Sequence, residues 1–189
     1  MRILQFLLPF LFASLVLFGC YVDSGRKSRS EIDGYDRYSN KTINVSLLTP
    51  TGWDAEVNIG GVYVVTPPAP SGGQIYVMSS SVERLMGEEA SESADLEAYR
   101  EYMWSQITEE EVGPGLDRSI GKSSLAGNDA YEIRYSFEPE TDPARWFVWE
   151  VFTLVDGKVY RIRTYSTEKA DPEFQKTVET MMASYRILR

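Results

Sequence analysis

Three patterns in the sequence predict an α+β fold in which an antiparallel β-sheet packs against two amphipathic helices. Much of the chain after residue 40 alternates apolar and polar side chains with a period of two, which is typical of strands that cover a core on one face. Two shorter segments repeat apolar residues at helical spacing. The dipeptide Asp156-Gly157, between two apolar runs, indicates a tight β-hairpin. Strands, a helix, more strands and a second helix are the order of an α+β sandwich.

The length and composition of the chain limit what it can do. Its 189 residues suit one domain with a terminal extension, and a formal net charge of −9 argues against a nucleic-acid partner. The sequence contains no histidine and a single cysteine. It therefore lacks a Ser-His-Asp or Cys-His catalytic set, histidine ligands for zinc or haem, and an internal disulfide. We expect no cofactor.

Residues 1–19 have the pattern of an export signal. Arg2 is the only charged residue before Asp23, and a nearly continuous apolar run covers residues 3–18. A short positive start, an apolar stretch and a small residue at its end describe a cleaved signal peptide. A membrane-spanning helix needs about 20 apolar residues. The run here is shorter and is interrupted by Pro9, so we expect residues 1–19 to be removed.

The only cysteine, Cys20, stands where the apolar run ends. The sequence Leu17-Phe18-Gly19-Cys20 resembles the lipobox of bacterial lipoproteins, with leucine three positions before the cysteine and a small residue directly before it. In that family the cysteine thiol carries diacylglycerol and becomes the mature N-terminus. The resemblance therefore implies lipid attachment at Cys20. The alternative for a lone cysteine in an exported chain is a free thiol or an intermolecular disulfide.

A lipid anchor would hold an acidic domain at a membrane surface. Anionic lipids repel a chain with this net charge, so acyl chains rather than the protein surface must supply the attachment. In enterobacterial lipoproteins, an aspartate directly after the lipidated cysteine resembles an inner-membrane retention signal. This chain has Tyr21 at that position. The tyrosine therefore favours the periplasmic face of the outer membrane, or the cell surface, over the inner membrane. Residues 20–37 are polar and contain glycine, so we expect a flexible tether before a domain at residues 38–189.

The first half of the domain is expected to form three strands and then a helix. The strand patterns lie at residues 43–47, 62–66 and 74–82, and a loop rich in proline and glycine separates the last two. Residues 95–108 present apolar side chains on one helix face, namely Leu96, Tyr99, Met103 and Ile107. Gly113-Pro114-Gly115 ends this helical pattern.

The second half is expected to form four strands, a helix and a short last strand. The strand patterns are residues 118–125, 131–137, 146–155, 159–165 and 185–188, with tight turns at Gly127-Asn128 and Asp156-Gly157. Residues 146–155 are apolar on both faces except at Glu150, which is typical of a central strand. Asp171 and Pro172 suit the N-cap and the first residue of a helix that carries Phe174, Val178 and Met181.

Several of these landmarks together resemble the PsbP-like superfamily. They are Pro50-Thr51-Gly52-Trp53 after a strand, the strand entry at residues 125–133, the hairpin at residues 152–162, and the closing residues 182–187. That superfamily includes the extrinsic photosystem II subunit and DcrB-type periplasmic lipoproteins. The resemblance covers about residues 38–189 and implies a PsbP-like α+β sandwich that serves in assembly or interaction, with no shared catalytic motif. The metal-binding histidine of the photosynthetic subunit has no counterpart, because this chain has no histidine.

Two acidic clusters are candidate contacts for calcium or for a basic partner. Glu109, Glu110 and Glu111 end the first helix, where three carboxylates oppose the helix dipole; the alternative is a solvated helix end. Glu138, Glu140 and Asp142 have alternating spacing that suits oxygen ligands for calcium. This second cluster lacks the glycine and the late glutamate of a calcium loop, so a solvated loop is its alternative.

The strand after the hairpin carries two candidate partner contacts, Arg161 and Arg163, which we expect to point outward. Either they form cross-strand ion pairs, with Glu132 and Arg134 on a neighbouring strand, or they form a basic recognition patch.

Glu132 and Glu150 lie among aromatic residues and could form the carboxylate pair of a hydrolase. Four aromatic residues are expected in the core, namely Trp146, Phe147, Trp149 and Phe152. The alternative is that one face of the sheet leaves a ligand groove between a helix and these aromatic side chains.

These observations lead to three hypotheses about function. The first is a lipid-anchored protein of the cell envelope that acts as a non-enzymatic interaction or assembly domain for another envelope protein. The alternative is a carrier of a small apolar ligand, which predicts a sizeable enclosed cavity lined by aromatic side chains. The third is a carboxylate-based hydrolase, which requires Glu132 and Glu150 to lie about 5–10 Å apart in one cleft.

Overall fold

The computed structural model describes residues 25–57, 62–68, 73–88, 94–107, 118–139, 144–167 and 172–189. The predicted signal peptide and Cys20 lie outside these ranges, as does Asp171.

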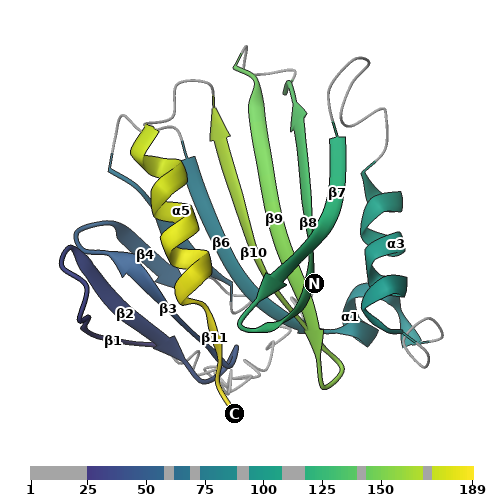
Figure 1. The fold of residues 1–189 in the computed structure, drawn as a ribbon, viewed down its shortest axis with the longest axis horizontal. Helices are drawn as coiled ribbons and strands as arrows, with labels where there is room; N and C mark the ends of the chain where they lie inside the picture. Colours follow the sequence, from purple (N-terminus) through teal and green to yellow (C-terminus); the bar gives the residue numbers. More distant parts are fainter. Residues whose placement is uncertain are drawn as a thin grey trace, which may run out of the picture.

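Seven antiparallel strands form the main sheet (Figure 1). In spatial order they are β4 (Asp54–Val57), β5 (Tyr63–Thr66), β6 (Gly73–Ser81), β10 (Lys158–Thr167), β9 (Trp146–Val155), β8 (Asn128–Phe137) and β7 (Arg118–Leu125). Strands β7 to β10 follow one another in the chain and each pairs with the next. β9 is therefore an interior strand, as its apolar pattern predicts.

Two tight turns set the register of this meander. At Asp156-Gly157 both residues have positive φ, 50° and 70°, and Lys158 pairs with Val155. This confirms the predicted two-residue hairpin. The other turn lies one residue earlier than predicted: Ala126 and Gly127 have positive φ, while Asn128 already pairs with Leu125 as the first residue of β8.

A second, four-stranded antiparallel sheet packs on the main sheet. Its strands are β1 (Arg26–Arg29), β2 (Tyr35–Asn40), β3 (Val45–Pro50) and β11 (Arg186–Ile187), in the order β1-β2-β3-β11. Tyr38 of β2 joins the two sheets, because its ring stacks on that of Tyr63 in β5 with centroids 3.6 Å apart. Gly25 has φ 75°, and a Cβ there would lie 2.3 Å from the Tyr38 ring, so only glycine fits beside this stack.

Three helices lie in the part of the chain that the structure describes: α1 (Val82–Met86), α3 (Leu96–Gln106) and α5 (Pro172–Ser184). Asp95 caps α3, its Oδ1 accepting a hydrogen bond of 2.8 Å from the backbone N–H of Ala98. The two predicted helices are thus confirmed as α3 and α5, whereas α1 was not predicted because five residues are too short for a helical period. Within the described ranges, none of the helices has both the length and the apolar character needed to cross a bilayer.

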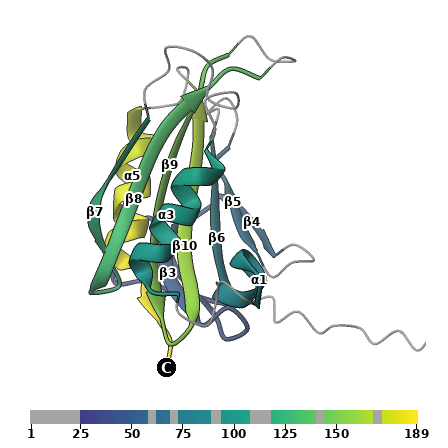
Figure 2. The same ribbon diagram turned by 90° about the vertical axis from the view of Figure 1, so that its right-hand side faces the viewer.

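The helices lie on both faces of the main sheet, so there are two cores. The larger core joins one face of the main sheet to the small sheet and to α5 through residues such as Val45, Ile162 and Val178. The smaller core joins the opposite face to α3 through residues such as Tyr99, Ile133 and Phe152. Figure 2 shows α5 and α3 on opposite sides of the sheet.

These features correct two predictions. The fold is α+β and antiparallel as predicted, but the described residues form two sheets and three helices instead of one sheet with two helices. The predicted tether at residues 20–37 is wrong from residue 26 onward, because β1 and the start of β2 lie there. All four side chains of β1 are exposed, so backbone pairing with β2 holds this strand without any apolar alternation in the sequence.

Candidate functional site

The face of the main sheet that carries α5 is covered unevenly (Figure 1). The small sheet and α5 pack on this face in the larger core, and the end of β7 with its turn approaches α5 across β9, which leaves a hollow beside the end of β8 and the beginning of β9. The result is an open groove of about 550 Å³ between α5 and the strands, which we call the α5 groove. A second hollow of about 280 Å³ continues beyond Trp149 toward Ala126 and Arg186.

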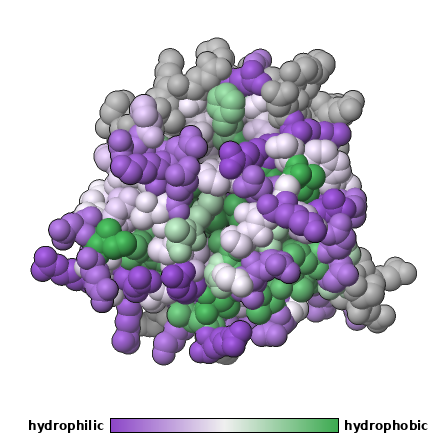
Figure 3. Space-filling view, viewed as in Figure 1, coloured by the Kyte–Doolittle hydropathy of each residue, from purple (hydrophilic) through white to green (hydrophobic). Residues whose placement is uncertain are grey.

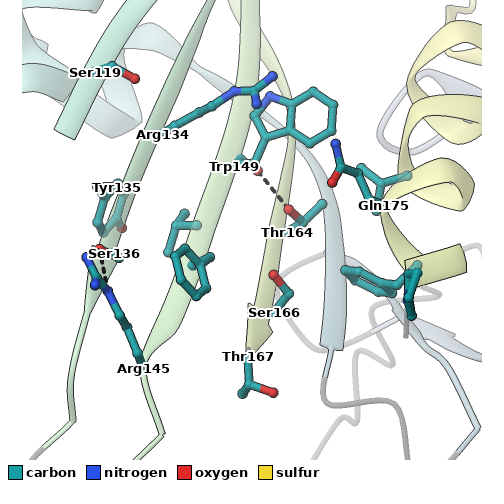
Figure 4. A pocket seen from close by; sticks show the side chains of 15 residues that line it. Ser119, Arg134, Tyr135, Ser136, Arg145, Trp149, Thr164, Ser166, Thr167 and Gln175 are labelled. Carbon is teal, nitrogen blue, oxygen red and sulfur yellow. Dashed lines mark hydrogen bonds between the residues drawn. The ribbon is translucent and has the colours of Figure 1, made fainter. Parts of the chain in front are cut away.

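The centre of the α5 groove is the indole ring of Trp149 on β9. The guanidinium carbon of Arg134, on β8, lies 4.4 Å from the centre of this ring. The indole Nε1 donates a hydrogen bond of 3.3 Å to Glu132 Oε2, and Arg134 Nε lies 3.4 Å from Glu132 Oε1. A cation, an aromatic ring and a carboxylate thus fix one another here, and Figure 4 shows Arg134 beside Trp149.

A second arginine stacks on an aromatic ring further along the groove. The guanidinium carbon of Arg145 lies 5.5 Å from the ring centre of Phe147, which is 40% exposed. Arg145 Nε and Nη2 donate to Ser136 Oγ at 3.2 and 2.9 Å. Phe147 and Trp149 are alternate residues of β9, so their side chains point to the same face of the sheet, about 7 Å apart along the strand.

The opposite wall of the groove is the first part of α5. Phe174 and Val178 are its apolar members, and the exposed side chain of Gln175 stands at the rim (Figure 4). Gly73 of β6 allows α5 to lie this close to the sheet, because a Cβ at that position would lie 2.6 Å from the Phe174 ring. The sheet surface between the walls carries the hydroxyl groups of Thr164, Ser166 and Thr167.

The charge of the α5 groove differs from that of the whole chain. The chain has a formal net charge of −9, yet the described residues that line the groove include Arg134 and Arg145 and no aspartate or glutamate. Figure 3 shows apolar side chains in the middle of this face with polar side chains around them. The groove can therefore bind a group that combines apolar surface with negative charge.

The predicted partner contacts Arg161 and Arg163 lie on the other face of the sheet and are not an exposed basic patch. Both bind the buried carboxylate of Glu150, which is 1% exposed. The cross-strand ion pairs that were the other interpretation of these arginines are thus present, but the arginines pair with Glu150 and not with Glu132. Burial alone would lower the pKa of Arg163; the Glu150 carboxylate and nearby tyrosine hydroxyls outweigh this effect and raise it above its ordinary value.

The predicted carboxylate pair of a hydrolase is wrong. Glu132 pairs in register with Val151, while Glu150 pairs with Ile133. Because neighbouring residues of a strand point to opposite faces, the two carboxylates lie on opposite sides of the main sheet. They cannot act on one bond.

The acidic clusters are described only in small part. Glu109, Glu110 and Glu111 lie outside the described residues, as do Glu140 and Asp142, while Glu138 directly follows β8. Within the described ranges, no group of three or more acidic or cysteine side chains is placed to hold a metal ion.

Sequence analysis anticipated a groove between a helix and the sheet but not its key residues. Phe147 and Trp149 were expected in the core; both line the α5 groove, where Phe147 is exposed and Trp149 is half-buried against the larger core, while Phe152 is fully buried as predicted. Both groove aromatics alternate with Val148 and Glu150 on the α3 side, so periodicity could not show which face remains uncovered. Arg134 was noted only as an ion-pair partner and Arg145 was missed. A ligand carrier was expected to have an enclosed cavity, whereas the α5 groove is open to solvent.

No protein-family model and no curated protein matches the chain. Among solved structures, it is similar to cyanobacterial PsbP (CyanoP) from Synechocystis sp. PCC 6803, with a TM-score of 0.57 and 15% identity over 86% of this chain and 98% of that chain. The fold is PsbP-like. This confirms the fold implied by the sequence landmarks, and at this identity it concerns the fold alone.

Two further solved structures are similar at lower TM-scores. A protein of unknown function from Pseudomonas aeruginosa, PA94, has a TM-score of 0.49 and 14% identity over 77% of this chain and 91% of that one. LpqN of Mycobacterium tuberculosis, which is involved in cell envelope biogenesis, has a TM-score of 0.44 and 14% identity over 77% of this chain and 83% of that one.

Proposed function

We propose that this chain is a lipid-anchored protein of the cell envelope whose PsbP-like domain binds a partner protein without catalysing a reaction. The α5 groove is the observation that carries the proposal. Tryptophan, tyrosine and arginine are the residues most enriched at the energetic centres of protein interfaces, and Trp149 and Arg134 stack at the centre of this groove. The aromatic rings there offer apolar surface that the fold itself leaves uncovered.

The lipid anchor rests on the lipobox-like sequence that ends at Cys20. Acyl chains would hold the acidic domain near a bilayer that repels it, on the outer-membrane or cell-surface side as Tyr21 suggests. The substitution Cys20→Ser removes the acylation site. We expect the wild-type protein to incorporate labelled palmitate and to fractionate with membranes, and the variant to do neither. A variant that still carries label would refute acylation at this cysteine.

Partner binding is tested in cells with a photoreactive amino acid on α5. Gln175 lines the α5 groove, whereas the adjacent Lys176 does not and is exposed. We expect a protein adduct with the probe at Gln175 and none at Lys176, and we expect Trp149→Ala to abolish the adduct. Because Trp149 also packs against the larger core, Arg145→Gln is a second, milder variant. Equal adducts from both probe positions, or none at Gln175, would contradict partner binding in this groove.

The second candidate, a carrier of a small apolar ligand, is favoured by the size of the groove. Its volume of about 550 Å³ lies in the range of small-molecule sites, roughly 300–1,000 Å³. Native mass spectrometry of protein purified from membranes tests this candidate. A bound small molecule that Trp149→Ala removes would support the carrier over the interaction domain.

A further inference from the structure

The two arginine–aromatic pairs of the α5 groove form a regular array. Trp149 is opposite Arg134 in the β8–β9 register, and Phe147 is opposite Ser136, which holds Arg145. The two pairs are therefore separated by two residues along the strands, or about 7 Å. In an extended polypeptide, side chains at alternate positions are separated by the same distance and point in the same direction.

Among the described residues, the positive charge of this array is balanced only in part. No described carboxylate lies within ion-pair distance of Arg145, whose guanidinium N–H groups donate to a neutral hydroxyl. Arg134 has a carboxylate partner, Glu132, at the long distance of 3.4 Å, and both side chains are partly exposed. Arg145 is thus the stronger and Arg134 the weaker site for an added negative charge.

The two walls of the groove differ in chemistry. The β8 side presents the two arginines, and the α5 side presents the apolar side chains of Phe174 and Val178. An extended segment lying along the groove directs alternate side chains to alternate walls. Its main chain would lie over the hydroxyl group of Ser166, which offers a hydrogen bond, whereas the buried Thr164 hydroxyl already donates to the Trp149 carbonyl.

Resting on the proposed function, we infer that the partner segment is an extended polypeptide in which acidic and apolar residues alternate. Two acidic side chains at alternate positions bind Arg145 and Arg134, and the apolar side chains between them pack on the α5 wall. The binding mode explains why a domain of acidic composition keeps two arginines beside its most exposed aromatic surface.

Peptide binding to the full-length protein in phosphatidylcholine nanodiscs tests the inference, because this bilayer has no net charge. The probes are three fluorescein-labelled peptides: the alternating GSEFEVEFG, the neutral GSQFQVQFG, and GEFSEVFEG, which has the composition of the first but no two acids at alternate positions. We expect fluorescence anisotropy to show the alternating peptide binding about tenfold more tightly than the other two, as two partly exposed ion pairs would produce. The affinity should also fall as salt rises.

Three variants assign the effect to the groove. We expect Arg145→Gln to weaken binding of the alternating peptide about fivefold, and Arg134→Gln to weaken it less. Glu132→Gln should strengthen it, because it releases Arg134. Arg84→Gln is the matched control, since it removes the same charge from an exposed position on α1. Equal binding of all three peptides, or an equal effect of Arg84→Gln and Arg145→Gln, would overturn the inference.

The outcomes separate this inference from the proposed function. If the adduct at Gln175 forms in cells but the alternating peptide has no preference, the inference fails and the proposed function stands. If no adduct forms at Gln175, the proposed function itself fails. If sodium laurate binds in a manner that depends on Arg145 and no peptide does, the occupant is a small anionic amphiphile and the inference is overturned.

Discussion

Glu150 on β9 and Arg163 on β10 face each other at the centre of the main sheet, and the Nε of the arginine donates to the Oε2 of the carboxylate. The other carboxylate oxygen accepts from Arg161 Nη1 at 3.3 Å. Glu150 is 1% exposed, so these two arginines replace the water that its charge would otherwise require. The pairing explains how a glutamate is accommodated on an interior strand that is otherwise apolar on this face.

Replacing Glu150 by glutamine should destabilise the protein strongly. Arg161 and Arg163 would remain partly buried without a compensating charge, and we expect the free energy of unfolding to fall by about 2–4 kcal/mol. Urea unfolding followed by tryptophan fluorescence measures this change. Glu132→Gln is the matched control on the opposite face, where the pair with Arg134 is half-exposed; there we expect a loss below about 1 kcal/mol. Similar losses in the two variants would contradict a structural role for the Glu150 cluster.

The main elements of the fold follow from local patterns in the sequence. The hairpin at Asp156-Gly157, the central strand β9 and the helices α3 and α5 each carry their own period or turn signal, and all four were predicted. The division into two sheets was not predicted. The strands expected at residues 43–47 and 185–188 are present as β3 and β11, but their pairing in a separate sheet joins distant parts of the chain. Strand β1 has only exposed polar side chains and depends on pairing with β2, so no apolar pattern indicates it.

The site depends on tertiary arrangement, and the sequence carried less information about it. The alternation of β9 places Phe147 and Trp149 on one face and Glu150 on the other, but it does not say that the small sheet and α5 cover only part of the first face. For the same reason Arg161 and Arg163 were expected to point outward. Whether a strand face meets solvent is decided by elements far away in the chain, here α5 and α3.

The buried tyrosines predict a loss of stability at alkaline pH. Burial raises the pKa of Tyr99 from 10.0 to about 12. Below pH 10 the hydroxyl is protonated in both states and its contribution to stability is complete. Between about pH 10 and 12 the unfolded chain releases the proton while the folded protein retains it, so stability falls by about 2–3 kcal/mol over this range. In Tyr99→Phe the dependence of unfolding free energy on pH should be shallower by this amount, and an unchanged slope would contradict the assignment.

Two buried tyrosine hydroxyls should respond in opposite directions to replacement by phenylalanine. The Tyr185 hydroxyl has no hydrogen-bond partner among the described residues, so Tyr185→Phe removes a desolvated polar group and should raise the free energy of unfolding by about 1 kcal/mol. The Tyr38 hydroxyl accepts a hydrogen bond of 2.8 Å from Asn40 Nδ2. Tyr38→Phe leaves this buried amide without that partner and should lower stability by about 1 kcal/mol. Thermal or urea unfolding compares the two, and losses of equal size would contradict the difference between them.

The position of α5 as a wall of the groove depends on Gly73. A methyl group at this position would lie 2.6 Å from the Phe174 ring, so Gly73→Ala must displace the ring or the helix that carries it. We expect a loss of about 1–3 kcal/mol in unfolding free energy, typical of overpacking, together with a weaker adduct from the probe at Gln175. Gly121→Ala is the control, because the nearest atom to its added methyl group, Glu132 Cγ, lies at an ordinary 3.9 Å. If both glycine variants retain wild-type stability and adduct formation, close packing of α5 on β6 does not set the width of the groove.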